Sequence, residues 1–394
     1  MRSNDWADRI RAQLAQVVDE GRWRAPREFD AWGPEGALEG ADVVSFASND
    51  YLGLSAHHDV VAAAHAALDR WGTGAGASRL VTGSRPVHAD LERGLAGWKG
   101  TEAAVCFPTG FAANLGVLSV LGGPGVRVLS DELNHASIID GCRLSRSQVA
   151  VYRHCDLAHL EDLLASGGGG VDTPALVVTD SVFSMDGDVA PLDDLLAICA
   201  RHGALLVVDE AHAVLGPHLD MAAVEEPARS RLVRVGTLSK TLGALGGFVA
   251  ASRDIVDLVI NRARPYIFST ALPPADAAAA LAALRILRAE EGEALVARLA
   301  SLVGRLSEAG VAPAAHPSPI VPVILGSEEA AMHASATLLD AGLWVPAIRP
   351  PTVPVGTSRL RVTLSAAHRD VDVDRLIDAL GAFPALAPPV AAAR

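Results

Sequence analysis

The sequence predicts an α/β protein with a large domain on a mostly parallel sheet of seven strands and a smaller α+β domain. Three observations predict this fold class. Seven short apolar runs alternate with helical patterns between about residues 55 and 270. The pattern then changes near Pro273-Pro274. Hydrophobic residues make up 50% of the 394 residues, which allows a large buried core and excludes a disordered chain.

The N-terminal part is expected to begin with an amphipathic helix, because Trp6, Ile10, Leu14 and Val17 recur at helical spacing. A short strand entering a polar turn follows at residues 43–54. The glycine run is expected to form a surface loop at 167–170. The seven apolar runs interpreted as strands are 103–107, 126–129, 149–152, 175–179, 204–209, 232–236 and 246–250.

The C-terminal part begins with an Ala/Leu/Arg-rich stretch that predicts one long helix over about 275–308. A proline-rich segment, further strands and a closing helix over about 370–381 follow, and the alanine-rich tail after 385 is expected to fray. We expect three parts: an N-terminal segment packing with the small domain, a large domain and a small C-terminal domain. Their ranges are 1–50, 51–272 and 273–394.

Charge and hydropathy exclude several classes of protein. Lys+Arg total 33 against Asp+Glu 46, a net charge of −13, which argues against nucleic-acid binding. The first 14 residues are charged and lack the apolar core of a signal peptide. The charge-free stretch 103–126 is interrupted by Pro108 and by glycines, which argues against a membrane span. We therefore expect neither nucleic acid nor membrane as a partner.

Cysteine and lysine usage narrows the chemistry further. The four cysteines lack the spacing of metal ligands or of a disulfide framework, so we expect reduced thiols, no metal and a cytoplasmic location. Lysine occurs only twice, at Lys99 and Lys240. Lys99 stands at a helix-ending turn between charged residues and is expected to be a solvated surface amine. Lys240 is then the candidate for any reaction that needs a lysine amine.

Polar side chains follow four strands of the predicted sheet. His135 comes after 126–129, Asp180 after 175–179, Asp209 and His212 after 204–208, and Lys240 after 232–236. Because ligands bind beyond the carboxyl ends of strands in such sheets, we expect these groups to meet at one edge. A fifth turn, after 103–107, opens a helix and is either an anion site or an ordinary strand-to-helix turn.

This set of groups fits the chemistry of pyridoxal phosphate. A lysine amine condenses with a carbonyl to form a Schiff base, and this cofactor carries a carbonyl, a phosphate, a phenolic oxygen and a pyridine nitrogen. A buried carboxylate such as Asp209 would keep the pyridine nitrogen protonated. The remaining candidate contacts are His212 to the phenolic oxygen, Thr237 and Gly110-Phe111 to the phosphate, and His135 to the ring face.

Nine ordered motifs resemble those of the α-oxoamine synthases, pyridoxal-phosphate enzymes of fold type I. The resemblance covers about residues 5–382. Asp180 stands where these enzymes commonly have Glu, and VDEAHAV replaces their frequent VDDAHG, with Val214 bulkier than Gly. The motifs are ASNDYLGL (47–54), SRLVTGS (78–84), FPTGFAAN (107–114), NHASIIDGCRLS (134–145), TDSVFSMDGD (179–188), VDEAHAVLG (208–216), GTLSKTLGALGG (236–247), RPYIFST (264–270) and AIRPPTVPVGTSRLRVTLSAAH (347–368).

The resemblance implies an acyltransferase that joins an amino acid to an acyl thioester with loss of CO2. Segment 347–361 is most similar to members that use L-alanine and a pimeloyl thioester in biotin biosynthesis, with coenzyme A or an acyl-carrier protein as carrier. The stretches NHASIIDG and RPYIFS also occur in glycine C-acetyltransferases, which remain an alternative. Family members are homodimers, and Thr270 is expected to reach the neighbour's phosphate.

The resemblance also assigns roles to individual residues. Lys240 binds the cofactor and takes the α-proton, and His135 stacks on the ring and assists the acyl carbonyl. Ser184 contacts the cofactor. The substrate-binding residues are expected to be Asn49 and Arg349 for the amino-acid carboxylate, Thr352 for the acyl site, and Arg22, in preference to Arg24, for the thioester or pimeloyl carboxylate.

Two other classes fit less well. The glycine-rich stretch 72–76 prompts a nicotinamide oxidoreductase, but it follows an alanine-rich helix rather than a strand and its third glycine is one residue early. A non-catalytic cofactor-binding relative would have no need of Lys240, Asp209 and His212 together.

Overall fold

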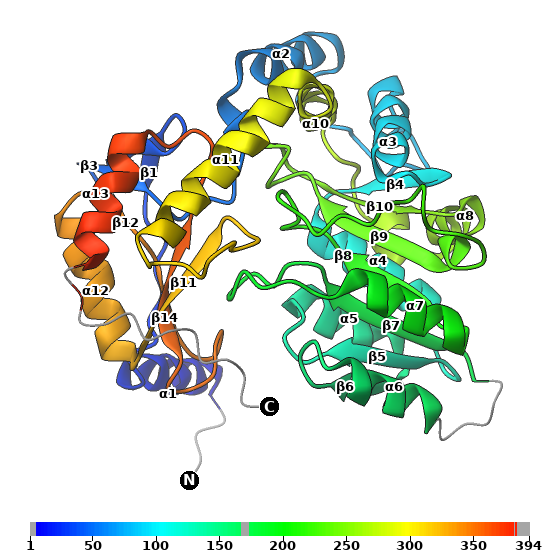
Figure 1. Ribbon diagram of the computed structural model, residues 1–394. Coiled ribbons are helices and arrows are strands. Elements are labelled where there is room, and N and C mark those ends of the chain that lie inside the picture. The colour runs from blue at the N-terminus through cyan, green and yellow to red at the C-terminus, as the bar shows by residue number, and fades with distance from the viewer. Residues whose placement is uncertain (1–4, 167–172, 382, 384–394) are drawn as a thin grey trace.

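The computed structural model describes residues 5–166, 173–381 and 383, in a larger and a smaller domain (Figure 1). The loop predicted at 167–170 and the tail after 385 lie outside the described residues. The larger domain contains a seven-stranded sheet in the order β4-β10-β9-β8-β7-β5-β6. Its strands are β4 (Ala103–Phe107), β5 (Arg127–Asp131), β6 (Gln148–Tyr152), β7 (Ala175–Asp180), β8 (Leu205–Asp209), β9 (Leu232–Thr237) and β10 (Gly247–Ala251).

The strand directions confirm the predicted, mostly parallel sheet. Each of the pairs β9–β8, β8–β7, β7–β5 and β5–β6 is parallel, whereas β10 runs antiparallel to both β4 and β9. β4 therefore runs in the same direction as the five parallel strands. The carboxyl ends of these strands lie at one edge, as the sequence predicted.

Helices cover both faces of this sheet, which is why its strands are continuous apolar runs. Val128 and Val207 point to one face, packing with residues of α4, α5 and α8, while Leu129 and Leu206 point to the other, packing with α6 and α7. The large-domain helices are α2 (His58–Trp71), α3 (Pro86–Lys99), α4 (Gly110–Leu121), α5 (Ala136–Ser145), α6 (Leu157–Ala165), α7 (Leu192–His202), α8 (Arg253–Arg262) and α9 (Arg264–Ile267).

The smaller domain combines two small sheets with helices α12 (Glu328–Asp340) and α13 (Asp370–Gly381). Parallel pairing of β3 with β12 joins the N-terminal segment to the C-terminal part and supports their expected grouping, while the boundaries at 50 and 272 stay a prediction. The strands are β1 (Phe29–Ala31), β2 (Glu35–Leu38), β3 (Ala41–Ser45) and β12 (Leu343–Trp344) in one sheet, and β11 (Ile320–Gly326), β14 (Ser358–Thr363) and β13 (Ala347–Ile348) in the other.

The prediction of a single long helix over about 275–308 is wrong. The structure has two helices, α10 (Pro274–Leu287) and α11 (Glu290–Glu308), and Ala289 between them is extended, with φ −108° and ψ 173°. The two helices meet closely at the break, since a Cβ on Gly292 would lie 2.4 Å from the backbone of Leu287. The Ala/Leu/Arg composition suits either helix and carries no signal for the turn between them.

The predicted N-terminal helix is confirmed as α1 (Trp6–Asp19), but none of its residues is buried. Its apolar stripe is uncovered within this chain, with Trp6 71% and Ile10 50% exposed. Among the described residues, no helix has the length and apolarity that crossing a membrane would require.

The expectation that Lys99 is a solvated surface amine is wrong. Its side chain is 5% exposed, Nζ lies 2.8 Å from Glu210 Oε2, and it sits 3.6 Å from the centre of the Trp98 ring. Arg234 shares the same buried carboxylate at 2.6 Å. A buried ammonium group needs a charged partner, and Glu210 provides one that the sequence alone did not connect to Lys99.

Candidate active site

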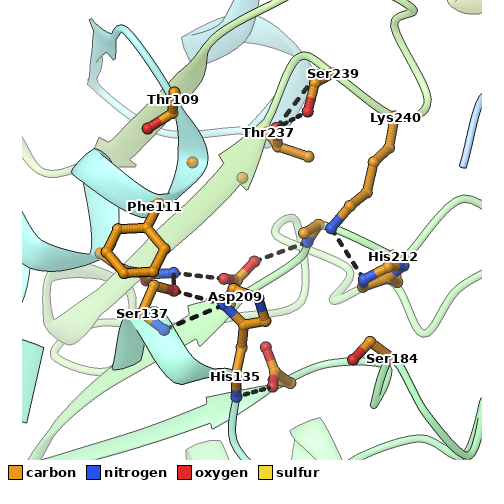
Figure 2. Close-up of a pocket in the computed structure, with 15 residues that line it drawn as sticks. Thr109, Phe111, His135, Ser137, Ser184, Asp209, His212, Thr237, Ser239 and Lys240 are labelled. Carbon is orange, nitrogen blue, oxygen red and sulfur yellow. Dashed lines mark hydrogen bonds between the residues drawn. The ribbon is translucent and has the colours of Figure 1, made fainter. Parts of the chain in front are cut away.

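A cavity of about 230 Å³ lies at the carboxyl edge of the large sheet (Figure 2). Residues that follow β4, β5, β7, β8 and β9 line it, so the predicted convergence of strand ends is observed. Eight predicted site residues are brought together here: Gly110, Phe111, His135, Ser184, Asp209, His212, Thr237 and Lys240. The other lining residues are Thr109, Asn114, Ser137, Asp180, Ala211, Gly236 and Ser239.

Lys240 extends its amine into this cavity from the turn after β9. Its Nζ lies 2.9 Å from His212 Nε2. Burial lowers the pKa of Lys240, and the nearby carboxylates of Asp209 and Asp180 oppose that shift. Burial, followed by repulsion from Lys240, holds the pKa of His212 well below its usual range. A neutral imidazole beside an amine of lowered pKa favours the unprotonated, nucleophilic form of that amine.

Asp209 is presented to the cavity at the end of β8. Asn114 Nδ2 donates to its Oδ2 at 2.6 Å, and the backbone N–H of Ala211 donates to its Oδ1 at 2.9 Å. Burial, and then repulsion by Asp209, raise the pKa of the neighbouring Asp180 well above its usual value. The raised pKa favours the protonated form of Asp180, whereas two hydrogen-bond donors hold Asp209 in place.

The start of α4 forms an anion cradle. Thr109 caps the helix by accepting from the N–H of Ala112 at 3.0 Å, and Thr237 Oγ1 faces the same turn. A Cβ on Gly110 would lie 3.1 Å from Thr237 Cβ, so a side chain there would crowd the approach of the two strand ends. Unpaired N–H groups and hydroxyls at a helix N-terminus bind phosphate well.

His135 lies across the cavity from Lys240, as the N-cap of α5. Its Nδ1 is 2.7 Å from Ser137 Oγ, and its backbone N–H donates to Asp180 Oδ2 at 2.8 Å. The Phe111 ring meets it edge to face, with centroids 6.3 Å apart. Burial, and a further contribution from Lys240, lower the pKa of His135, so its ring is neutral and suited to stacking.

Comparison with known proteins gives the family. The family model "aminotransferase class I and II" matches residues 41–380. An 8-amino-7-oxononanoate synthase of Anaeromyxobacter dehalogenans is 50% identical over 394 residues, which cover 98% of this chain and 97% of the relative. The chain belongs to the 8-amino-7-oxononanoate synthase family. The relative from Geobacter sulfurreducens is 48% identical over 94% of this chain and 96% of its own.

Solved structures agree with this family in fold and cofactor. Sphingomonas wittichii serine palmitoyltransferase superposes with a TM-score of 0.85 at 33% identity over 94% of this chain and 95% of that one. The 8-amino-7-oxononanoate synthase of Francisella tularensis gives a TM-score of 0.70 at 27% identity over 86% of this chain and 96% of that one. A serine palmitoyltransferase structure with PLP matches at a TM-score of 0.86 and 32% identity, over 95% of this chain and 97% of that one.

Like other members of the 8-amino-7-oxononanoate synthase family, the chain is a pyridoxal-phosphate-dependent acyltransferase of fold type I. The cavity fits the cofactor: Lys240 offers an amine for its aldehyde, Asp209 an anion for its ring nitrogen, and the start of α4 a cradle for its phosphate. When bound, the cofactor supplies an electron-withdrawing ring.

Five predicted residues do not line the cavity. Arg349 is hydrogen-bonded to the carbonyl of Gly21, with Nη1 at 2.5 Å. Arg22 pairs with Glu20 at 3.2 Å. The Arg349–Gly21 bond places both predicted arginines near each other, on the small domain. The others are Asn49, which accepts from Arg361 Nη2 at 3.2 Å, and Thr270 and Thr352, which are exposed.

Sequence reasoning missed three residues of this site. Asn114 holds Asp209 and also donates to Ser137 Oγ at 2.9 Å. Tyr51, which is buried, is hydrogen-bonded to His212 Nδ1, and burial raises its pKa above its usual value, so it keeps its proton. Arg361 donates to the carbonyl of Ser184 at 2.5 Å and to Asn49. All three lie in quoted motifs, and Asn114 stands one helical turn after Gly110, a signal that could have found it.

Proposed function

We propose that the enzyme condenses L-alanine with a pimeloyl thioester to give 8-amino-7-oxononanoate, CO2 and a free thiol, a step of biotin biosynthesis. The observation that supports this proposal most is the 50% identity, over 98% of the chain, to an 8-amino-7-oxononanoate synthase. The cavity that contains Lys240, Asp209 and His212 agrees with it. Segment 347–361 supports the choice of substrates.

Each cavity residue has a task in this reaction. With the cofactor bound, Asp209 would hold a proton at its ring nitrogen, and His212 would donate toward its phenolic oxygen. Lys240, whose pKa is lowered, would accept the α-proton of the amino acid. His135 stacks on the ring and donates to the acyl carbonyl as that oxygen gains negative charge. Ser184, which lines the cavity, would contact the cofactor.

The small domain provides the substrate-binding groups in this proposal. Asn49 and Arg349 hold the amino-acid carboxylate, Thr352 lines the acyl site, and Arg22 meets the thioester or the pimeloyl carboxylate. Arg361 donates to Ser184, Thr363 and Asn49, and so orients Asn49. Because the chain carries a net charge of −13, these local arginines must attract anionic substrates.

Replacing Arg349 with glutamine is expected to raise the KM for the amino acid roughly 10–100-fold, with a smaller effect on kcat, because a charge-assisted contact to the carboxylate is lost. Steady-state kinetics with varied amino acid measures this. Arg201→Gln is the matched control, since Arg201 is 55% exposed and, among the described residues, pairs with Glu161 of α6, away from the cavity. An unchanged KM in Arg349→Gln would remove Arg349 from the substrate site.

The decisive assay is thiol release by the purified enzyme with two substrate pairs. Pimeloyl-CoA or pimeloyl-acyl-carrier protein with L-alanine is compared with acetyl-CoA and glycine. We expect turnover with a pimeloyl thioester and alanine, and the faster of the two carriers identifies the natural one. Preference for acetyl-CoA and glycine would overturn the proposal in favour of the glycine C-acetyltransferase reaction.

A second copy of the chain is the proposed macromolecular partner, in a homodimer. Val81 and Phe268 are 74% and 70% exposed, and a hydrogen bond of 3.0 Å from Ala271 to Ala77 brings their two segments together, with exposed Thr270 beside them. We expect a dimer by sedimentation velocity, and Val81→Asp with Phe268→Asp should shift it toward monomer and lower activity. A fully active monomer would contradict this.

The four unpaired cysteines support a reducing, cytoplasmic location.

A further inference from the structure

His154 forms an ion-pair cluster outside the cavity, with Asp131 at the end of β5 and Asp188 in the loop after β7. Its Nδ1 lies 3.0 Å from Asp131 Oδ1 and its Nε2 lies 2.5 Å from Asp188 Oδ2. Both ring nitrogens face carboxylate oxygens, which only accept hydrogen bonds, so both nitrogens carry hydrogens and the ring is positively charged. The His154 side chain is 18% exposed and that of Asp131 only 1%.

The charge of the ring has a clear physical origin. Burial alone would favour the neutral form, but the hydrogen bonds to Asp131 and Asp188 outweigh it and raise the pKa of His154 to about 12. Within the described part of the chain, Asp131, His154 and Cys155 are the one group with the spacing of metal ligands. A histidine that binds metal directs a nitrogen lone pair at the ion, whereas here both nitrogens direct hydrogens at carboxylates.

One side of this cluster holds the turn that ends at His135. Asp131 accepts from the backbone N–H groups of Leu133 and Cys155, both at 2.9 Å. Its carbonyl also accepts from the N–H of Asn134 at 3.3 Å. The turn from 131 to 135 is therefore built around the carboxylate that His154 neutralises, and it places His135 at the cavity.

The other side of the cluster holds the loop that carries Ser184. Asp188 closes that loop by accepting at its carbonyl from the N–H of Phe183 at 3.0 Å. The Phe183 ring, which is buried, stands perpendicular to the His154 ring with centroids 4.3 Å apart. Ser184 follows directly, and its carbonyl accepts from Arg361.

The same loop is pressed against the small domain. Asp186 pairs with Arg359 of β14. Gly187 has φ +70°, and a Cβ there would lie 2.1 Å from the carbonyl of Ile320 in β11, which leaves no space between loop and strand. His154 thus anchors, from the large-domain side, a loop whose opposite side contacts Arg359 and also Arg361, the arginine that holds Asn49.

We propose that His154 is a positioning residue, which sets the distance between the His135 turn and the Ser184 loop by pairing with Asp131 and Asp188. It does not line the cavity and acts through the residues that do. The consequence is that cofactor affinity and amino-acid binding depend on an ion pair outside the site. The idea rests on the proposed function only for the identity of the substrates.

The test compares His154→Gln and Asp188→Ala with Asp188→Asn, each purified with its cofactor and then reconstituted. In the first two variants the loop loses its anchor, and we expect the dissociation constant for pyridoxal phosphate and the KM for the amino acid to rise about 10-fold each, with kcat within about 3-fold. Asp188→Asn can donate to a neutral His154 ring, retains the contact, and should stay within about 2-fold of the natural enzyme. Asp188 is 43% exposed, so its variants should fold.

His202→Gln is the matched control, because His202 also faces a carboxylate, Glu161 at 3.5 Å, but on the outer helices. Cofactor titration is read without acyl substrate, so failure of the proposed substrates leaves this result intact. A lower melting temperature with unchanged cofactor affinity and KM would show a purely structural role and overturn the proposal. Loss of cofactor affinity in the natural enzyme on chelator treatment would overturn it in favour of a metal site.

Discussion

Lys240→Ala is expected to reduce kcat at least about 1,000-fold and to abolish covalent retention of pyridoxal phosphate. Two contributions are lost together, the amine that bonds the cofactor aldehyde and the base for the α-proton. The structure places this amine 2.9 Å from His212 in the cavity, and burial lowers its pKa. His212 cannot replace it, because its own pKa is well below the usual range and it lacks a nucleophilic amine.

The measurement is borohydride reduction followed by peptide mass spectrometry, together with thiol release. The chain contains only two lysines, so Lys99→Arg is the natural control. Arginine retains a positive charge for Glu210, and we expect the reduced cofactor to remain on Lys240 in that variant. Cofactor attached to Lys99, or turnover by Lys240→Ala, would contradict the assignment.

The lysine count also shows what the sequence could and could not predict. Few lysines made Lys240 a candidate by elimination, and its position after a strand pointed to the same residue independently. The reasoning about Lys99 failed because the burial of a side chain depends on what packs over it. Lys99 ends α3 and meets Glu210, more than 100 residues away in the sequence, only after the fold forms.

The large sheet could be predicted because parallel strands covered on both faces are continuous apolar runs with polar ends. Residues at or shortly after the end of such a strand lie at the sheet edge, which is why Asp209 and His135 could be predicted. Tyr51 and Arg361 have no such marker. Tyr51 reaches His212 from 161 positions earlier in the chain, and Arg361 reaches Asn49 across 312 positions. Contacts between segments this distant require the tertiary structure.

Asp209→Asn is expected to lower kcat at least about 100-fold, because the carboxamide cannot hold a proton at the ring nitrogen of the cofactor. The structure allows a sharper comparison than this variant alone. Asp180 lines the same cavity, and burial and repulsion by Asp209 raise its pKa well above its usual value, which favours its protonated form. Asp180→Asn keeps the shape of a side chain whose raised pKa already favours the neutral form, so it should lower kcat less than about 10-fold.

The pair of variants separates charge from shape. Asn114 and the Ala211 N–H orient Asp209 at 2.6 and 2.9 Å, and in Asp209→Asn the Ala211 contact can persist through the amide oxygen. Cofactor absorbance spectra and kcat should be recorded for both variants at saturating cofactor, because weaker cofactor binding would otherwise lower the observed kcat. Equal losses of kcat in the two variants would mean that both carboxyl groups are needed, and that the negative charge of Asp209 is not the deciding property. A large loss of kcat confined to Asp209→Asn would show that Asp209, the buried carboxylate that two donors fix in place, is the group that keeps the ring nitrogen protonated.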